Sequence, residues 1–449
     1  MSRAASRNRA VVIAYHYPPD PAVGSLRARN VAQALAANGF EVDVISATRA
    51  GTPTDSLDGN VHVVRVVLTT SPRDFLTGLK RLVARLVIRG DSGAPRPTAP
   101  NLAGASWKAP KHVSTLRRWM GAITWLPDDR QGFIIPAARA ATNYLRGDGM
   151  DILYTSGPPF SDHLVGLLLR RCRRFRWVLE FRDPWTGENS KPWFVRARFT
   201  DRIERWAENQ CLLKCDGIVA VTRAYADVLT ERYGDRITEK LAVVRNGVPH
   251  TFPPVQSDRS TFRIVHAGSF YLGRDPKPFL RAVAALHQSG RLGPRHLDVR
   301  LVGDCRHFNG EPIAPEVERL GLTDSVTFTD WLPHDETLRL MQSSDVLLLL
   351  AQRQPLSVPN KLFEYLGIGK PILAITDESS ETAQLLRDVG GHFIVGERRG
   401  PEEILEALDA LATGDAAGSR SPETLERLAT RTQMSTLVEW LRQLPLRSD

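Results

Sequence analysis

Short apolar runs, rich in β-branched residues, alternate with longer helical patterns along almost the whole of this chain. Such alternation is typical of βαβ units, in which helices connect parallel strands. The sequence therefore predicts an α/β protein built from doubly wound parallel sheets. The runs interpreted as strands include Val11–Tyr15, Glu41–Ser46, Ile152–Tyr154, Trp177–Phe181 and Gly217–Val221 in the first half, and Arg263–His266, Asp298–Val302, Val326–Phe328, Asp345–Leu350 and Pro371–Ile375 in the second.

The chain is long enough for more than one such sheet, because 449 residues correspond to two or three domains of ordinary size. The segment Gly247–Pro254 is rich in proline, which is typical of a linker. We therefore expect one domain over residues 1–249 and a second over 250–430. A helix at about 430–449 could pack back on the first domain. Such sheets bind ligands at the carboxyl ends of their strands, so two of them facing each other would place a site in the cleft between them.

Composition excludes several other classes of protein. Hydrophobic residues make up 42% of the chain and charged residues 24%, as in an ordinary folded protein. No Cys/His cluster has the spacing of a zinc site, and Cys211 and Cys215 fit a buried structural role better than a ligand or redox role. The first apolar run, Val11–Tyr15, is too short for a signal peptide, and no run approaches the roughly 20 residues that span a bilayer. We therefore expect a cytoplasmic protein.

The net charge of +9 leaves room for an anionic partner, which could be a phosphate, a nucleic acid or a membrane surface. A nucleic acid fits least well, because the basic residues are dispersed and no recognised motif accompanies them. Within Arg73–Arg89, apolar residues repeat at helical spacing and basic residues occupy the other face. Such a helix either lies on an anionic membrane surface, which here would be the inner face of the cell membrane, or packs its apolar side on its own domain. The sequence leaves both interpretations open.

Loops that follow predicted strands of the first half carry residues suited to a ligand. In the first of them, Gly24 would let a backbone approach a ligand closely, and Arg27, in the first turn of the following helix, could add positive charge. A second helix is predicted to begin at Ser161, so that His163 falls in its first turn, at the mouth of the expected cleft. That position makes a functional role for His163 about as plausible as a structural one.

Another strand of the first half, Trp177–Phe181, is followed by Arg182 and Asp183. An arginine and carboxylates at a strand end could position an acceptor that carries many hydroxyl groups. The alternative is a structural ion pair, in which Arg182 pairs with Asp183 or with Glu180.

In the second half, the loop after Arg263–His266 contains Gly268, Ser269 and Arg274, which suit a phosphate group. Further on, a helix is predicted to begin at Asn360, which we expect to act as its N-cap.

The first turn of that helix is unusual in carrying Lys361, because a cation is unfavourable at the positive end of the helix dipole unless an anion compensates it. Glu364, three residues later, falls on the same face, where a carboxylate could accept hydrogen bonds from a ribose diol. The alternative is a simple surface pair of Lys361 with Glu364.

The order of these motifs resembles family 4 glycosyltransferases, and the likeness is weakest over about residues 70–110 and after 400. The matching pieces are YHYPPDPAVGSLRARNVAQALAANGFEVDVIS, LPDDRQGFIIPAARAA, LYTSGPPFSDHLVGLLL, WVLEFRDPWTG, VRNGV, IVHAGSFYLGRDPKPFLRAV, LVGD and VPNKLFEYLGIGKPILAI. The last piece is similar to a subgroup with the KLFEYL form. The resemblance implies a GT-B fold, in which two Rossmann-like domains face each other across a cleft.

The same resemblance implies a retaining transfer of a sugar from a nucleotide-diphosphate donor, with neither a metal nor another cofactor. It implies a role in the synthesis of cell-surface polysaccharide or glycolipid, with a sugar or a lipid-linked molecule as acceptor. Glu364 would hold the ribose hydroxyls, and Lys361 with Arg274 and the Gly268–Ser269 backbone would neutralise the diphosphate. Other residues would act from the first domain: Gly24 near the diphosphate or sugar, and His163, Arg182 and Asp183 near the transferred sugar and the acceptor.

One position departs from the family pattern. Many members carry a second Glu eight positions before the one at Glu364, and this chain has Leu356 there. Two alternatives therefore stay open beside a transferase: a sugar-nucleotide epimerase, and a protein that binds nucleotide sugars without catalysis.

Overall fold

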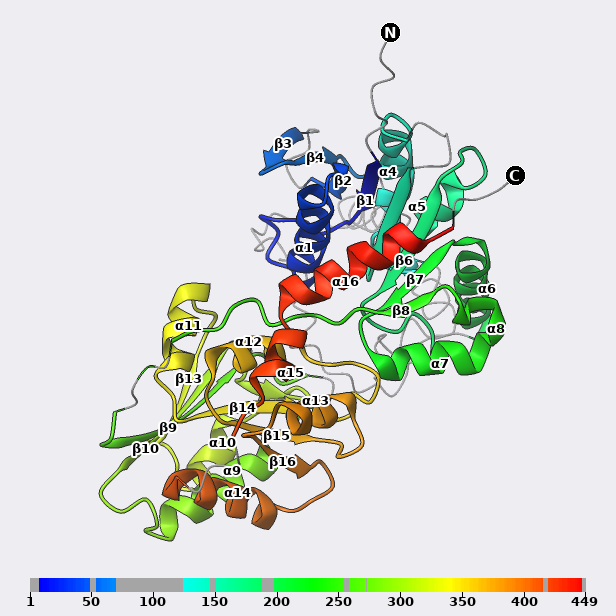
Figure 1. Cartoon of the computed structure of the whole chain (residues 1–449). Helices are drawn as coiled ribbons and strands as arrows, with labels where there is room; N and C mark the ends of the chain where they lie inside the picture. The colour runs from blue at the N-terminus through cyan, green and yellow to red at the C-terminus, as the bar shows by residue number, and fades with distance from the viewer. Residues whose placement is uncertain are drawn as a thin grey trace, which may run out of the picture. The chain divides into compact units, whose positions relative to one another are not determined.

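The computed structural model describes residues 8–48, 54–69, 124–145, 151–187, 198–253, 255, 258–271, 273–414 and 419–445. They belong to two compact units, which we call unit 1 and unit 2 (Figure 1). The chain passes from unit 1 to unit 2 between Arg245 and Asn246 and returns to unit 1 between Thr432 and Gln433. The boundaries expected from the sequence lie at 249 and at about 430.

Unit 1 contains a sheet of eight strands in the order β3-β4-β2-β1-β5-β6-β7-β8. Neighbouring strands are parallel except β3 and β4, which form an antiparallel pair at one edge. The strands are β1 (Arg9–Ile13), β2 (Glu41–Ala47), β3 (Thr54–Asp58), β4 (Val61–Val66), β5 (Ile152–Gly157), β6 (Arg176–Phe181), β7 (Gly217–Ala220) and β8 (Leu241–Val243). The described helices of this unit are α1 (Val23–Ala37), η2 (Gln131–Phe133), α4 (Ile134–Ala141), α5 (Ser161–Leu169), α6 (Arg198–Lys214), α7 (Arg223–Tyr233), α8 (Asp235–Thr238) and most of α16 (Thr430–Gln443).

Unit 2 contains a fully parallel sheet of six strands in the order β13-β10-β9-β14-β15-β16, and a separate small hairpin. The strands are β9 (Thr261–Ala267), β10 (His296–Val302), β13 (Val326–Thr329), β14 (Val346–Ala351), β15 (Ile372–Thr376) and β16 (Phe393–Gly396), with β11 (His307–Phe308) and β12 (Glu311–Pro312) in the hairpin. The described helices are α9 (Lys277–Gln288), α10 (Ala314–Arg319), α11 (His334–Gln342), α12 (Asn360–Ile368), α13 (Glu381–Val389), α14 (Pro401–Thr413) and α15 (Pro422–Arg427).

The sheet of unit 2 is covered on both faces, which is why its strands are almost continuously apolar. In β14, Leu348 and Leu350 pack in one core with α9 and α14, while Leu347 and Leu349 pack in another with α12 and α13. Alternate side chains of a strand point to opposite faces, so one apolar strand supplies both cores. The predicted α/β class, with two doubly wound parallel sheets, is confirmed.

The last helix of unit 1 is α16, which follows unit 2 in the sequence. The α16 side chains Met434, Leu437, Val438 and Leu441 are buried in the same core as the α1 side chains Val31 and Leu35. Figure 1 shows α16, in red, beside α1, in blue. The helix expected at about 430–449 is present as α16, and the short helix α15 ends before it at Arg427.

Three further expectations concern the surface and the thiols. No described helix combines the length and the apolar character needed to cross a membrane. The amphipathic segment Arg73–Arg89 lies outside the described residues. Cys211 and Cys215 are buried thiols, as expected, and burial raises the pKa of Cys215 to about 12.

Candidate functional site

The candidate site of unit 2 is centred on the start of α12. The helix is held in place by Leu362, Phe363 and Leu366, which are buried in the unit 2 core. The expectation that Asn360 caps it is wrong: Pro359 is the N-cap residue, and Asn360 is the first helical residue. No side chain caps this end, and its first turn holds no acidic residue. A helix start without a capping side chain presents backbone N–H groups and the positive end of the dipole to an anion.

Lys361 and Glu364 form an ion pair on the face of α12 that borders this end. The distance between Lys361 Nζ and Glu364 Oε2 is 2.8 Å, and the side chains are 32% and 14% exposed. The pair is therefore more enclosed than an ordinary surface pair three residues apart. It holds the ammonium group in place while leaving part of it accessible.

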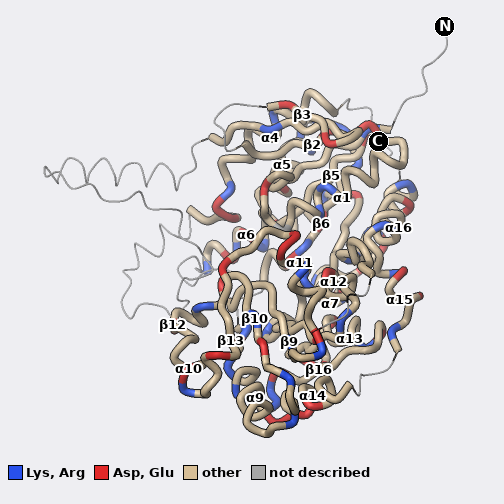
Figure 2. Tube along the Cα trace, turned by 90° about the vertical axis from the view of Figure 1, so that its left-hand side faces the viewer, with Lys and Arg blue, Asp and Glu red and all other residues tan. Residues whose placement is uncertain are grey.

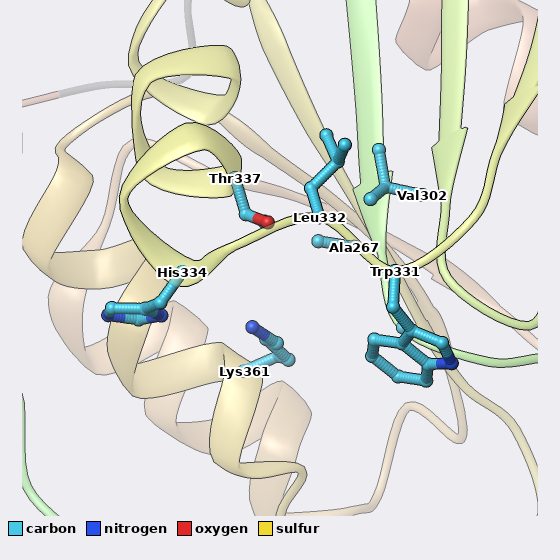
Figure 3. Close-up of a pocket in the computed structure, with 8 residues that line it drawn as sticks. Ala267, Val302, Trp331, Leu332, His334, Thr337 and Lys361 are labelled. Carbon is cyan, nitrogen blue, oxygen red and sulfur yellow. The ribbon is translucent and has the colours of Figure 1, made fainter. Parts of the chain in front are cut away.

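The accessible part of Lys361 lines a pocket of about 150 Å³. Figure 3 shows its ammonium group directed into the space between His334 and Trp331. The residues of the wall come from the carboxyl ends of β9, β10 and β13, from the start of α11 and from α12: Ala267, Gly268, Val302, Trp331, Leu332, His334, Thr337 and Lys361. A mostly apolar wall with a single cation suits a ligand that has a flat apolar part and an anionic part.

Gly268, one of the predicted phosphate-binding residues, is part of this wall, and its N–H donates to the Val302 carbonyl over 2.9 Å. Ser269 follows it and is buried. His266 lies behind Gly268: a Cβ on Gly268 would be 3.3 Å from His266 Nε2. The structure therefore brings Gly268, Ser269 and Lys361 to the same edge of the sheet, as parallel strand ends require.

The His266 imidazole is 3% exposed and forms one hydrogen bond, 3.0 Å between Nδ1 and the Leu348 carbonyl oxygen. A carbonyl can only accept, so Nδ1 carries the proton and Nε2 has a lone pair. Nε2 has no hydrogen-bond partner among the described residues. Burial lowers the pKa of His266 to about 4, and the charges of Arg274 and Lys361 act in the same direction. His266 is therefore neutral at pH 7.

Arg274 is half-buried next to this wall but does not line the pocket. Its guanidinium lies 4.4 Å from the centre of the Tyr271 ring and donates to Gln354 Oε1 over 3.2 Å. Arg274 would have to exchange Gln354 for a ligand in order to bind a phosphate.

In unit 1, the structure brings together two candidates from separate motifs, Gly24 and Arg182. A Cβ added to Gly24 would overlap the Arg182 guanidinium, so only glycine lets that group lie against the start of α1. Arg182 also donates to the Pro158 carbonyl. The contact arises because β1, β5 and β6 are parallel neighbours whose carboxyl ends share one edge of the sheet.

Arg27 does not face a ligand, contrary to the sequence-based expectation. Its guanidinium is 5% exposed and pairs with Glu180, which is fully buried, over 2.7 Å. It also donates to the carbonyl oxygens of Val244 and Arg245. Arg27 and Glu180 are 153 residues apart in sequence, so a reading of adjacent residues could not reveal the pair. Neither of the pairs proposed for Arg182 is among the ion pairs of the described residues.

His163 lies in the first turn of α5, as the sequence predicts, and its imidazole is fully buried. Nδ1 lies 2.9 Å from Thr155 Oγ1, and the ring packs against Phe160 and Trp185. Burial lowers the pKa of His163 to about 3, and Nε2 has no hydrogen-bond partner among the described residues. The imidazole could reach a sugar only if an aromatic neighbour moved. Asp183, in contrast, is exposed.

Several polar groups at strand ends were missed by the sequence analysis. His16 Nδ1 lies 2.8 Å from Asp20 Oδ2 just after β1, and Trp331 and His334 follow β13. The same rule that identified Gly268, namely that ligands bind at the carboxyl ends of strands, would have found them. No group of three or more His, Cys, Asp or Glu side chains in the described ranges is arranged to hold a metal ion.

Comparison with known proteins extends these observations. Residues 102–252 match the family described as Glycosyltransferase Family 4, and residues 261–413 match the family described as Glycosyl transferases group 1. A search among curated proteins found no match.

Several solved structures share the fold over nearly the whole chain. A sucrose-phosphate synthase from Thermosynechococcus elongatus is 14% identical, with a TM-score of 0.59 and coverage of 98% of this chain and 99% of that one. An E. coli structure described as trehalose-6-phosphate bound with UDP-2-fluoro glucose is 13% identical, with a TM-score of 0.60 and coverage of 98% and 100%. The Anabaena protein HepE, solved in complex with UDP, is 15% identical, with a TM-score of 0.55 and coverage of 97% and 100%.

Proposed function

This chain belongs to the family 4 glycosyltransferases and has their GT-B fold, and on that premise we propose that it transfers a sugar from a nucleotide-diphosphate donor to an acceptor hydroxyl. We propose further that the transfer retains the anomeric configuration, uses no metal or other cofactor, and serves polysaccharide or glycolipid synthesis. The acceptor would be a sugar or a lipid-linked molecule, and the enzyme would act on the cytoplasmic side of the membrane.

The observation that carries the proposal is the position of Lys361. Lys361 lies in the first turn of α12, and no side chain caps the start of that helix. Together with Gly268, it lines a pocket of about 150 Å³. The same wall includes the exposed Trp331 and the apolar side chains Val302 and Leu332, which suit a flat base. Two UDP complexes among the similar structures fit a nucleotide donor.

The chemistry follows from charge. As the bond between the sugar and the diphosphate breaks, negative charge grows on the leaving phosphate. Lys361 and the first N–H groups of α12 would stabilise it, and cations and N–H donors held in place in this way contribute several kcal/mol. Glu364 fixes the ammonium over 2.8 Å and would accept from the ribose hydroxyls with its remaining lone pairs.

Unit 1 would supply the remaining groups. Arg182, held against Gly24, and the exposed Asp183 are proposed to face the transferred sugar and the acceptor. His163 keeps this role in the proposal only if its aromatic cover opens. The acceptor would attack the same face that the phosphate leaves, and the phosphate itself would take the acceptor proton, so no strong protein base is required.

The test replaces Lys361 or Glu364 by Ala. Loss of Lys361 should lower kcat/KM for the donor by about 100- to 1,000-fold, the effect of removing one transition-state donor. Lys277→Ala is a matched control, because Lys277 also lies in the first turn of a helix of unit 2 and pairs with a carboxylate, Glu311 at 3.4 Å, but does not line the pocket. Full activity in both Lys361→Ala and Glu364→Ala would overturn the proposal.

A thermal-shift panel of nucleotide diphosphates and their sugars identifies the donor without an acceptor. Donor binding without turnover would instead favour a non-catalytic binding protein, the alternative suggested by Leu356, which lies half-buried just before α12. Release of an epimerised sugar nucleotide in the absence of acceptor would favour an epimerase.

A further inference from the structure

Helix α6 buries two carboxylates beside the apolar residues Ala207, Cys211 and Leu212, and it exposes three large apolar side chains. Its carboxylates Glu204 and Glu208 are buried, 7% and 0% exposed. Its large apolar side chains Ile203, Trp206 and Leu213 are 41%, 58% and 40% exposed. Exposing this much apolar area is unfavourable in water, and the fold gains nothing from it.

Polar partners inside unit 1 surround the Glu208 carboxylate on the inward face of α6. Glu208 accepts hydrogen bonds from Thr186 Oγ1 over 2.7 Å and from Tyr233 OH over 2.9 Å, and Arg232 lies 3.3 Å away. Ala207, Cys211 and Leu212 complete this inward face, so Ile203, Trp206 and Leu213 lie outside the packed face of α6.

The exposed apolar side chains lie on one side of the helix, with Gln210 between Trp206 and Leu213. Ile203, Trp206 and Leu213 are separated by three and seven residues, so at 100° per residue they fall within about 80° of one another around the helix. Helix α5, which packs beside α6, adds the exposed Leu168. We call these three side chains of α6, together with Leu168, the α6 stripe.

Exposed basic residues outnumber exposed acidic ones on α5 and α6, while α8, which also packs against α6, carries the exposed acidic residue Asp235 and, at its C-cap, the exposed Glu239. Over the described residues as a whole, basic and acidic residues are interspersed (Figure 2). Among the described residues of α5, of the turn after it and of α6, however, the only exposed acidic residue is Asp201. The exposed basic residues of these segments are Arg171, Arg173, Arg174, Arg198, Arg202, Arg205 and Lys214.

We propose that the α6 stripe docks on a lipid bilayer that contains anionic headgroups. The arginines would bind the headgroups, while Trp206, an aromatic residue with a polar N–H, suits the boundary between headgroups and acyl chains. The positive charge of this surface disfavours two other occupants of the α6 stripe. A second copy of this surface would set like charges against each other, and so would the basic segment Arg73–Arg89 of the same chain.

The experiment measures co-sedimentation of the full chain with vesicles of phosphatidylcholine alone or mixed with phosphatidylglycerol. The wild-type chain should bind only the anionic vesicles, and less strongly as salt is raised. Arg202→Ala with Arg205→Ala should lower the partition coefficient about 25-fold, since each basic residue near such a surface contributes about fivefold. Trp206→Ala should lower it at least about tenfold.

Two matched controls separate this surface from general effects. Leu57→Ser changes the most exposed large apolar residue of the described chain, on β3, and Arg387→Ala changes an exposed arginine on α13. Both should bind vesicles as the wild type does. All variants should keep the wild-type melting temperature, because the changed side chains are exposed.

Three outcomes would overturn the proposal. The wild-type chain could fail to bind anionic vesicles. It could bind them equally well after the α6 changes, which would place docking elsewhere. Analytical ultracentrifugation could show a dimer that the Trp206→Ala change dissociates, which would make a second copy the occupant. Because the assay requires no sugar transfer, its result is independent of the proposed enzymatic activity.

Discussion

At the residue scale, the buried ionisable groups divide into those with a complete set of partners and those without. The Arg27 guanidinium is matched by Glu180 and two backbone carbonyls, and Glu180 also accepts from Tyr154 and Ser156. A buried pair of this kind is stable only because its remaining polar atoms are satisfied. His266 differs, since one nitrogen is satisfied and the other is not.

This arrangement makes His266 a source of acid sensitivity. Its pKa is about 4 in the folded chain against an ordinary 6.5, so the unfolded chain binds the proton more readily. The stabilising effect is complete above pH 6.5 and is lost as the pH falls toward 4. Between pH 7.5 and 5, the wild-type chain should lose about 2 kcal/mol more free energy of unfolding than His266→Asn.

Asn is chosen because its amide can still donate to the Leu348 carbonyl. Urea unfolding at several pH values measures the difference. If the variant and the wild-type chain lose stability in parallel, His266 is not the group that titrates.

At the element scale, the packing of α5 on the unit 1 sheet depends on one glycine. A Cβ on Gly166 would lie 2.3 to 2.5 Å from atoms of the Trp177 indole, which is fully buried and donates to Thr155 Oγ1 over 3.1 Å. The indole is therefore held on both sides and cannot move away. The glycine sets the distance between the helix and β6.

Gly166→Ala should therefore destabilise the protein by about 2 kcal/mol, even though Ala is the better helix former. The overlap involves Nε1, Cε2 and Cζ2 of the indole. Because Phe is smaller and lacks the indole N–H and the fused second ring, Trp177→Phe should relieve part of the cost of Gly166→Ala. Chemical unfolding of the two single variants and the double variant gives the coupling energy, and additive effects would contradict the packing argument.

At the scale of the whole molecule, the two units are not two consecutive stretches of sequence. The chain enters unit 2 after Arg245 and returns to unit 1 at Gln433. The returning helix fills the unit 1 core with Leu437 and Leu441, and Trp440 packs close to Gly217 of β7. Unit 1 is therefore complete only when the end of the chain has been made.

Leu437→Ala should destabilise unit 1 by about 2–5 kcal/mol, because it leaves a cavity in a closed core. Glu439→Ala, exposed on the same helix, should change the stability by less than about 0.5 kcal/mol. Hydrogen exchange of amides in β1 and β5 reports unit 1 specifically. Equal protection of those amides in both variants would mean that α16 does not support the unit 1 core.

The sequence by itself determined the two parallel sheets, the positions of their main strands along the chain, and the position of Lys361 and Glu364 at a helix start. These features depend on neighbours along the chain: apolar periodicity, turn residues and spacing within one helical turn. It could not show short strands such as β8, whose three residues carry little periodicity.

Only the tertiary structure decided which groups meet across the sheets. It paired Arg27 with Glu180, enclosed His163 among aromatic rings, set Arg182 against Gly24 and turned the apolar side of α6 outward. Each of these contacts joins residues far apart in sequence or depends on what covers a face. The periodicity of apolar residues shows which face of a helix or strand is apolar, but it does not show which elements pack against that face. The burial of a side chain and its hydrogen-bond partners therefore follow only from the packed fold.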